Sequence, residues 1–303
     1  MNNNPIVSIV VTTYNSEAYL KKQLNSLISQ TYKNIKIFVF DDCSTDSTIE
    51  ILKTYEEQYD FIKVIQHTTP LGVIKNFEYG ISFVDSELIA LCDHDDIWMP
   101  DKISLQVESI KEYKTPALVH SDLEVIDAND QIMYKSFFQL KGYSFPNKKS
   151  LDILISRSGI MGNTILFNRA LKQVILPFFE NIPMHDYYIG VMNEIYGTRI
   201  TISQPLVKYR IHNTNIGNRQ QSILKKIKGF FYNDLPYVNR KVFLLDLLNA
   251  KLDSLDKSII NDFLKCIEYN KFEFFLKCLN KKEYFKGKVF YKLRLILRYI
   301  IKI

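Results

Sequence analysis

The first third of the chain alternates between two hydrophobic periods, and this alternation limits the possible folds more than any other feature. Strand-like apolar runs alternate with segments of helical spacing, in the order 6–13, 17–29, 35–40, 45–59, 61–66, 73–83 and 87–92. This order predicts a parallel sheet with covered faces and right-handed crossovers. Because ligands of such sheets bind at the carboxyl ends of the strands, we expect functional residues in the loops 12–16, 41–47, 68–72 and 93–96.

Three acids follow the apolar run 88–92 directly, namely Asp93, Asp95 and Asp96. A buried strand has no packing use for carboxylates at its end, whereas a hard divalent cation that bridges phosphates needs oxygen ligands on a stiff edge. The pattern therefore predicts a site for a metal and a diphosphate. The alternative is a solvated acidic turn that caps a helix beginning near Pro100.

Two other strand ends are also polar. Thr12, Tyr14 and Asn15 lie at the end of the first expected strand, and the loop 41–46 follows the second. Within that loop Asp42 could accept hydrogen bonds from a base or a ribose. For Ser44 and Thr45 we expect a different role, the capping of the next helix.

Composition limits the class of protein. The chain has 303 residues with 47% hydrophobic content, which is enough for a substantial core. Its four cysteines lie far apart without Cys-x-x-Cys spacing, so neither a zinc site nor a disulfide framework is expected, and a reducing compartment fits. The start lacks a signal-peptide pattern, and apolar runs stay well below the roughly 18 residues that span a bilayer. We therefore expect a cytoplasmic protein.

The net charge of +6 divides unevenly along the chain. Residues 221–303 hold 18 Lys and Arg against 8 Asp and Glu, while residues 1–220 hold 21 against 25. The rear segment has helical periodicity and few glycines or prolines, which predicts a helical appendage after a first domain of residues 1–220.

The last stretch, 286–303, has the pattern of a basic amphipathic helix. Such a helix could lie in an anionic membrane interface, on the preceding domain, or on a second copy in a homo-oligomer. Nucleic acid is not an expected partner, because the segment shows none of the known nucleic-acid-binding motifs.

Three of these motifs together resemble the inverting glycosyltransferases of family 2. They are the opening run 7–15, the Asp41-Asp42-x-Ser-Thr-Asp loop, and the Asp93-x-Asp95-Asp96 cluster followed by Pro100-Asp101. The resemblance covers roughly residues 5 to 218. It implies the GT-A fold, an α/β architecture with a Rossmann-like, mostly parallel sheet and flanking helices. To this fold the chain adds the C-terminal helical appendage.

The resemblance also implies roles for the donor site. Asp42 would contact the nucleotide base, Asp93 the ribose and donor sugar, and Asp95 a divalent Mg²⁺ or Mn²⁺. Asp96 extends the cluster and leaves open which acid meets the metal. The expected nucleotide-sugar-binding residues are Thr12, Tyr14, Asn15, Asp42, Asn76, Asp93 and Arg210.

Sugar transfer with inversion needs a base, because an acceptor hydroxyl is a poor nucleophile until its proton leaves. The candidate is Asp186, which lies in a segment similar to the acceptor-side segment of the family. In the alternative interpretation Asp186 is a helix N-cap, and Tyr187 and Tyr188 belong to the core. His185 could orient a substrate or have a local structural role.

A last polar segment, 209–215, follows the apolar run 205–207. Arg210 and His212 are two residues apart at a strand end and so point to the same side, which suits a pyrophosphate or a metal. The resemblance implies that His212 is a metal or phosphate ligand and that Arg210 contacts phosphate; a plain surface strand end is the alternative. The segment 159–168, which contains Gly162-Asn163-Thr164, is expected to shape the acceptor side of the pocket.

The function implied is metal-dependent inverting transfer of a sugar from a nucleotide diphosphate sugar to a glycan or lipid-linked acceptor in surface polysaccharide synthesis. The segments 71–77 and 92–98 resemble the rhamnosyltransferase branch, which implies dTDP-rhamnose, and UDP-hexoses remain alternatives. The second function class is a catalytically silent module that binds a glycan or a partner. A nucleotidyltransferase would need a glycine-rich loop after the first strand, and 12–16 lacks one. If the segment 286–303 lies in an anionic membrane interface, the protein would be peripheral on the inner face of the cell membrane.

Overall fold

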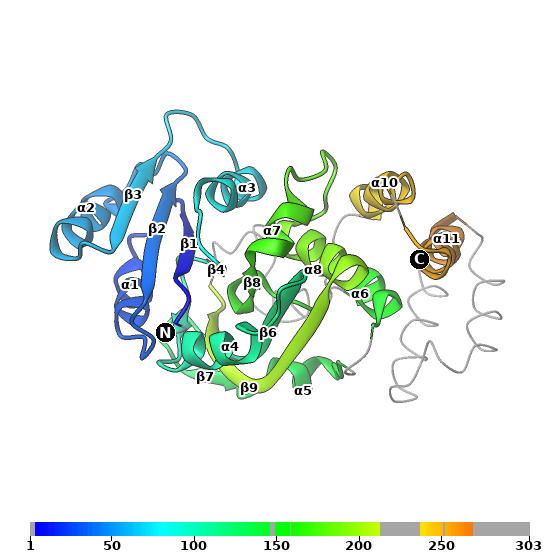
Figure 1. The fold of residues 1–303 in the computed structure, drawn as a ribbon. Coiled ribbons are helices and arrows are strands. Elements are labelled where there is room, and N and C mark those ends of the chain that lie inside the picture. Colours follow the sequence, from blue (N-terminus) through cyan, green and yellow to red (C-terminus); the bar gives the residue numbers. More distant parts are fainter. Residues whose placement is uncertain (1–3, 146–148, 158, 213–236, 251, 269–303) are drawn as a thin grey trace, which may run out of the picture.

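A computed structural model describes residues 4–145, 149–157, 159–212, 237–250 and 252–268. Its first half, defined here as residues 4–92, forms a parallel sheet with covering helices (Figure 1). Strand β1 (Val7–Thr13) pairs with β2 (Ile35–Asp41) on one side and β4 (Leu88–Cys92) on the other, and β3 (Ile62–Gln66) lies beyond β2. All residues of β1 and β4 are buried, which explains their continuous apolar runs.

The second half, residues 93–212, extends the same sheet. The order of strands is β3-β2-β1-β4-β8-β6-β9-β5, and β7 pairs with β6. Strands β6 (Ala117–Ile126) and β9 (Thr198–Arg210) are parallel to each other, and the short β8 (Leu166–Asn168) is antiparallel to both β4 and β6. Strands β5 (Ile97–Trp98) and β7 (Ile132–Tyr134) are antiparallel to their partners. The sheet is thus mostly parallel, as the sequence predicts.

Helices cover both faces of the sheet and create two cores. One core lies under α1 (Leu20–Ile28), α2 (Thr48–Gln58) and α4 (Lys102–Ile110), and α5 (Phe137–Lys141) packs at its margin. The other lies under α3 (Val73–Phe83), α6 (Leu151–Arg157), α7 (Arg169–Ile175) and α8 (His185–Tyr196). Val10 of β1 belongs to the second core, and Ile9 and Val11 belong to the first, as alternation along a strand requires.

The expected strands agree with the structure within two residues, but two helices begin three residues later than expected. Helix α2 begins at Thr48 with Ser47 as its N-cap, so the capping role expected for Ser44 and Thr45 is wrong. The hydroxyl of Ser44 instead donates to Asp41 and accepts from the backbone of Asn15. These contacts hold the loop after β2 to the loop after β1, and the helix can start only after them.

Two C-terminal helices pack on the second core, at the end of the molecule opposite α2 (Figure 1). They are α10 (Tyr237–Leu248) and α11 (Ser254–Glu268). Phe243 is fully buried, and its ring contacts the rings of Tyr187, Tyr188 and Phe179. The described part of the appendage therefore shares a core with α8, and the division expected at residue 220 stays a prediction. The amphipathic segment 286–303 lies outside the described residues.

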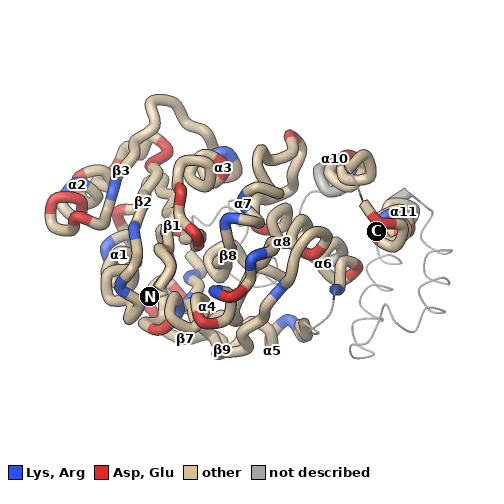
Figure 2. The backbone as a smooth tube through the Cα atoms, viewed as in Figure 1, with Lys and Arg blue, Asp and Glu red and all other residues tan. Residues whose placement is uncertain are grey.

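Charges of both signs are spread over the helices around the sheet (Figure 2). Within the described residues, none of the helices combines the length and apolarity that crossing a bilayer requires.

Candidate active site

The acids after β4 form a loop between β4 and β5, and Asp96 is its internal anchor. Asp96 is fully buried. One carboxylate oxygen accepts the backbone N–H of Arg210 at 2.9 Å, and the other accepts the side-chain amide of Asn163. Burial, together with the charges of Asp95 and Asp93, raises the pKa of Asp96 well above its usual range. The carboxylate of Asp96 is thus held by the protein, which leaves Asp95 as the candidate metal ligand.

Asp95, in the acid loop, faces His212, which follows the end of β9. The Nε2 atom of His212 lies 2.8 Å from Oδ2 of Asp95. Burial alone would raise the pKa of Asp95, but the charge of His94 and the hydrogen bond from His212 lower it, so the group stays ionised. The chain therefore brings an ionised carboxylate and an imidazole together from positions 117 residues apart.

This pair fits a divalent cation. The pair offers one carboxylate oxygen and one imidazole nitrogen, both of which bind divalent cations, close enough together to reach the same ion. Burial raises the pKa of Asp93 to about 8, and the charges of Asp95 and Asp186 add to this shift. Like charges that disfavour each other in this way are relieved by a cation. The described residues contain no group of three acidic, His or Cys side chains arranged to hold a metal, so phosphate oxygens would complete the coordination.

Asp186 lies opposite the acid loop in the first turn of α8. Its Oδ1 accepts the backbone N–H of Tyr187 at 2.7 Å, and its Oδ2 accepts that of Gly162 at 3.1 Å. Burial raises the pKa of Asp186 to about 6 against these hydrogen bonds. The N-cap of α8 is Met184, so the alternative interpretation of Asp186 as an N-cap is wrong. Tyr187 and Tyr188 are core residues, as the same interpretation expected.

A single short turn contacts both sides of the site. The 3₁₀ turn η1 (Gly162–Thr164) donates from Gly162 to Asp186 and from Asn163 to Asp96. A Cβ at Gly162 would lie 2.8 Å from Nε2 of His185, so the turn packs too closely there for a side chain. The acceptor-side role expected for the segment 159–168, which includes this turn, stays a prediction. The structure shows that the turn contacts Asp186 and the acid loop.

The loop after β1 supplies the exposed side of the candidate site. The ring of Tyr14 is 46% exposed. Asn15 has a φ of 47° and accepts the backbone N–H of Thr45 at 2.8 Å through its side chain. The carbonyl of Thr12 lies 3.1 Å from Nδ1 of His94, which joins this loop to the acid loop.

Two residues expected to bind the nucleotide sugar, Asp42 and Asn76, form hydrogen bonds with the protein's own backbone instead. The carboxylate of Asp42 accepts the N–H groups of Leu71 and Gly72 at 2.6 and 2.9 Å. Asn76 is 1% exposed, and its side-chain amide donates to the carbonyl of Phe40 and pairs with His67. The geometry therefore argues against direct donor contact by Asn76. Asp42 remains at the strand end with lone pairs left over, and its base contact stays a prediction.

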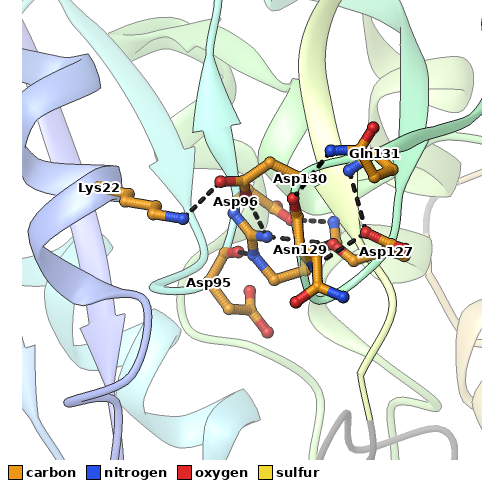
Figure 3. A network of polar contacts seen from close by, with 8 residues as sticks. Lys22, Asp95, Asp96, Asp127, Asn129, Asp130 and Gln131 are labelled. Atoms are coloured by element: carbon orange, nitrogen blue, oxygen red, sulfur yellow. Dashed lines mark hydrogen bonds and ion pairs between the residues drawn. The ribbon is translucent and has the colours of Figure 1, made fainter.

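Arg210 is also internal. Its side chain has no exposed surface, and its Nε donates to the backbone carbonyl of Asp95 at 2.8 Å. Nη1 pairs with Asp130 and donates to the carbonyl of Asp127 (Figure 3). The geometry argues against the phosphate contact expected for Arg210, because its guanidinium serves the protein interior.

His185 takes the structural alternative. It is 5% exposed, and its ring stacks on Phe77 with 4.0 Å between centroids. Burial lowers the pKa of His185 to about 3, so the ring is neutral.

Tyr209 is a residue to which the sequence interpretation gave no role. Burial raises the pKa of its hydroxyl well above the usual range, and the charges of Asp96, Asp95, Asp93 and Asp186 act in the same direction. The hydroxyl of Tyr209 is therefore close enough to all four carboxylates for their charges to act on it. The only sequence signal was its place beside Arg210 and His212, and a tyrosine at a strand end is commonly a core residue.

The sheet with its acid loop at the end of β4, and a facing carboxylate on a helix of the second half, define a GT-A glycosyltransferase. The chain belongs to glycosyl transferase family 2, whose profile matches residues 8–175. An uncharacterized glycosyltransferase of Haemophilus influenzae is 28% identical over 286 residues, which cover 90% of this chain and 87% of the relative. The putative glycosyltransferase EpsE of Bacillus subtilis is 34% identical over 128 residues, or 42% of this chain and 46% of EpsE.

Solved structures confirm the fold prediction. Residues 1–349 of S. aureus TarS, in complex with UDP-GlcNAc, match with a TM-score of 0.62 and 19% identity over 97% of this chain and 79% of that one. The mannosyltransferase PcManGT of Pyrobaculum calidifontis, in complex with GDP-Man and Mn²⁺, matches with a TM-score of 0.52 and 15% identity over 98% and 88%.

Proposed function

We propose that the protein transfers a sugar with inversion from a nucleotide diphosphate sugar to an acceptor hydroxyl, with a divalent cation at Asp95 and His212. The observation that carries the proposal is the pairing of Asp95 with His212 on one side and the facing Asp186, with its pKa near 6, on the other. An ionised metal ligand and a separately tuned base are what this reaction needs. The nucleotide sugars bound to TarS and PcManGT, and the Mn²⁺ of PcManGT, support it.

In the proposed reaction Asp186 takes the proton of the acceptor hydroxyl as the oxygen attacks the anomeric carbon. The bond between that carbon and the diphosphate oxygen breaks, and the electron pair leaves with the diphosphate. Bound Mg²⁺ or Mn²⁺ would neutralise the departing charge. Asp93, Tyr14 and Asp42 line the proposed donor side, and attack from the side opposite the leaving group inverts the anomeric configuration.

The substrates belong to the proposal as well. We retain dTDP-rhamnose and UDP-hexoses as donors and a glycan or lipid-linked saccharide of a surface polysaccharide as acceptor. Purified protein with a panel of nucleotide sugars, scored by metal-dependent nucleotide release, would identify the donor. A silent binding module is disfavoured, because Asp93, Asp95 and Asp186 are all present at the site.

We also propose that the enzyme works in the cytoplasm and that the segment 286–303 attaches it to an anionic membrane surface. Sedimentation with anionic vesicles compares the full chain with one that ends at Lys286. Equal binding of both chains would refute the attachment.

The first prediction tests the metal site. Asp95→Asn removes the charge that would bind the cation and keeps the size of the side chain, so turnover should fall at least about a hundredfold. The measurement is nucleotide release with and without Mn²⁺. Glu108→Gln, an exposed acid on α4, is the matched control and should behave as the wild type. Full activity of Asp95→Asn, or of the wild type in a chelator, would refute the metal role.

A further inference from the structure

The backbone of the turn between β6 and β7 is held in a conformation that directs the carboxylate of Asp130 toward the protein interior. The Oδ1 atom of Asp127 accepts the backbone N–H groups of Asn129 and Gln131 at 2.8 and 2.9 Å. Asp130 has a φ of 67°, a left-handed conformation that aspartate and asparagine tolerate better than most residues. The side chain of Asp130 points toward Lys22 (Figure 3) and also pairs with Arg210, the last residue of β9.

Asp130 bridges two cations from distant parts of the chain. One oxygen pairs with Nη1 of Arg210 and the other with Nζ of Lys22 on α1. Partial burial alone would raise the pKa of Asp130, but its hydrogen bonds with Lys22 and Arg210 and their charges lower it, so the carboxylate stays ionised. The two cations differ in exposure: the side chain of Lys22 is 53% exposed, whereas that of Arg210 is 0% exposed.

Arg210 touches the acid loop at two points. Its Nε holds the carbonyl of Asp95 at 2.8 Å, and its backbone N–H holds the carboxylate of Asp96 at 2.9 Å. Its guanidinium lies 4.6 Å from the ring centroid of Tyr19, and that ring lies 4.8 Å from the ring of His212. One buried side chain therefore supports both members of the proposed ligand pair.

A buried guanidinium needs a counter-charge, because backbone carbonyls supply only partial charges. Asp130 supplies such a charge, because its carboxylate pairs with Nη1 of Arg210. Without that charge the Arg210 guanidinium would be drawn toward another carboxylate or toward water, and its hydrogen bond to the acid loop would weaken. The orientation of Arg210 therefore depends on a turn that lies outside the site.

We propose that Asp130 is a positioning residue for the metal ligands, which it holds in place through Arg210. The inference rests on the proposed function, in which Asp95 and His212 bind the cation. Groups outside the ligand shell orient the ligands, and their loss typically lowers metal affinity about 10- to 100-fold. Asp130 would thus act on metal affinity rather than on stability alone.

The test measures Mn²⁺ binding in the presence of UDP and, separately, of dTDP, by the loss of the free-ion paramagnetic resonance signal. Asp130→Asn keeps the left-handed preference and removes the charge, and we expect it to weaken Mn²⁺ binding about tenfold or more. Lys22→Met is the matched control. It removes the exposed partner of Asp130 and leaves the Arg210 pair, so the affinity should stay near that of the wild type.

A double-mutant cycle separates positioning from loss of folding. In an Arg210→Gln background, Asp130→Asn should weaken Mn²⁺ binding no further, because its effect passes through Arg210. Additive losses would overturn the inference, and so would an equal loss in Lys22→Met. Wild-type affinity in Asp130→Asn overturns it while leaving the proposed function intact. Asp95→Asn decides the proposed function separately: undiminished Mn²⁺ binding there would refute the metal site itself.

Discussion

Asp95 and Asp186 are carboxylates with opposite pKa shifts, and the difference follows from their neighbours. Asp95 meets His212 and His94, which favour its charged form, whereas Asp186 is held by two backbone N–H groups that burial outweighs. Environments that shift the pKa values of two acids in opposite directions suit them to different tasks. Asp95 remains an anion that can bind a cation, whereas Asp186 gains and loses a proton near neutrality.

The second prediction concerns the pH dependence of Asp186. Its pKa of about 6 lies above the ordinary 3.8, so the base is protonated and idle below about pH 6. We expect kcat/KM to rise with pH through a limb centred near 6. In Asp186→Asn that limb should disappear and the rate should fall about 10²- to 10⁴-fold, with nucleotide binding retained.

The same shift has a consequence for stability. Because the folded-state pKa is raised, ionisation of Asp186 costs stability as the pH rises through about 4 to 6. Asp186→Asn should therefore unfold at a higher temperature than the wild type at pH 7 and lose this advantage near pH 4. Normal turnover of the variant with saturating acceptor would mean that another residue is the base.

At the scale of the element, α4 carries a buried lysine, Lys102, as its first residue. The Nζ atom of Lys102 lies 2.9 Å from the side-chain oxygen of Gln106 and 3.6 Å from the ring centroid of Trp98. Burial lowers the pKa of Lys102 to about 7 from 10.5. The helix thus holds an amine whose charge is costly inside the protein.

The third prediction is that Lys102 makes stability depend on pH in the alkaline range. Below about pH 7 the amine is charged in both states, and the full cost of burying it is present. Between about 7 and 10.5 only the unfolded state is protonated, so that cost declines as the pH rises. Urea unfolding at pH 7, 8 and 9 should show the wild type gaining stability relative to Lys102→Met. Parallel behaviour of the two proteins would contradict the shifted pKa.

Hydrophobic periods were sufficient to predict the elements of the first half, because β1 and β4 are buried on both faces and α1 to α3 each have one apolar face. They failed where a side chain competes with the helix start, as Ser44 does through its contacts with Asp41 and Asn15. The pairings of β8 and β9 were not predicted. Strand β9 contains Pro205 and a register shift against β6, and both hide the alternation.

Strand-end reasoning located the loops of the candidate site but not the use of each side chain. Asp93, Asp95, Asp186 and His212 do come together. Asn76 and Arg210 are instead occupied by backbone groups 36 and 115 residues away, and Asp96 is held by Asn163 at a separation of 67 residues. No local pattern records such partners, so a polar residue near a strand end could not be assigned to ligand or protein.

At the scale of the whole molecule, α10 and α11 complete the core behind the helix of Asp186. Phe243 is the central contact, since its ring packs on Tyr187 and Tyr188. Lys149 adds an ion pair with Asp256 of α11. The C-terminal helices therefore support the candidate active site, although none of the proposed ligands lies in them.

The fourth prediction tests this support. Phe243→Ala should lower the free energy of unfolding by about 3–5 kcal/mol, because it leaves a cavity among aromatic rings. Turnover should fall as well, since α8 carries Asp186. Leu245→Ala is the control on the same helix: this side chain is 44% exposed, and its loss should cost little. Equal melting temperatures for the two variants would show that α10 is dispensable to the core.

The packing of Phe243 behind α8 also sets an order of events during synthesis. A ribosome adds about 5–20 residues per second, so Phe243, 57 residues after Asp186, is added roughly 3 to 11 s later. During that interval β1 to β4 can already pair, while Tyr187 and Tyr188 of α8 still lack their contact with Phe243. The nascent chain should therefore form the parallel strands β1 to β4 before the core behind α8 closes, and the uncovered face of α8 is where a chaperone would bind in between.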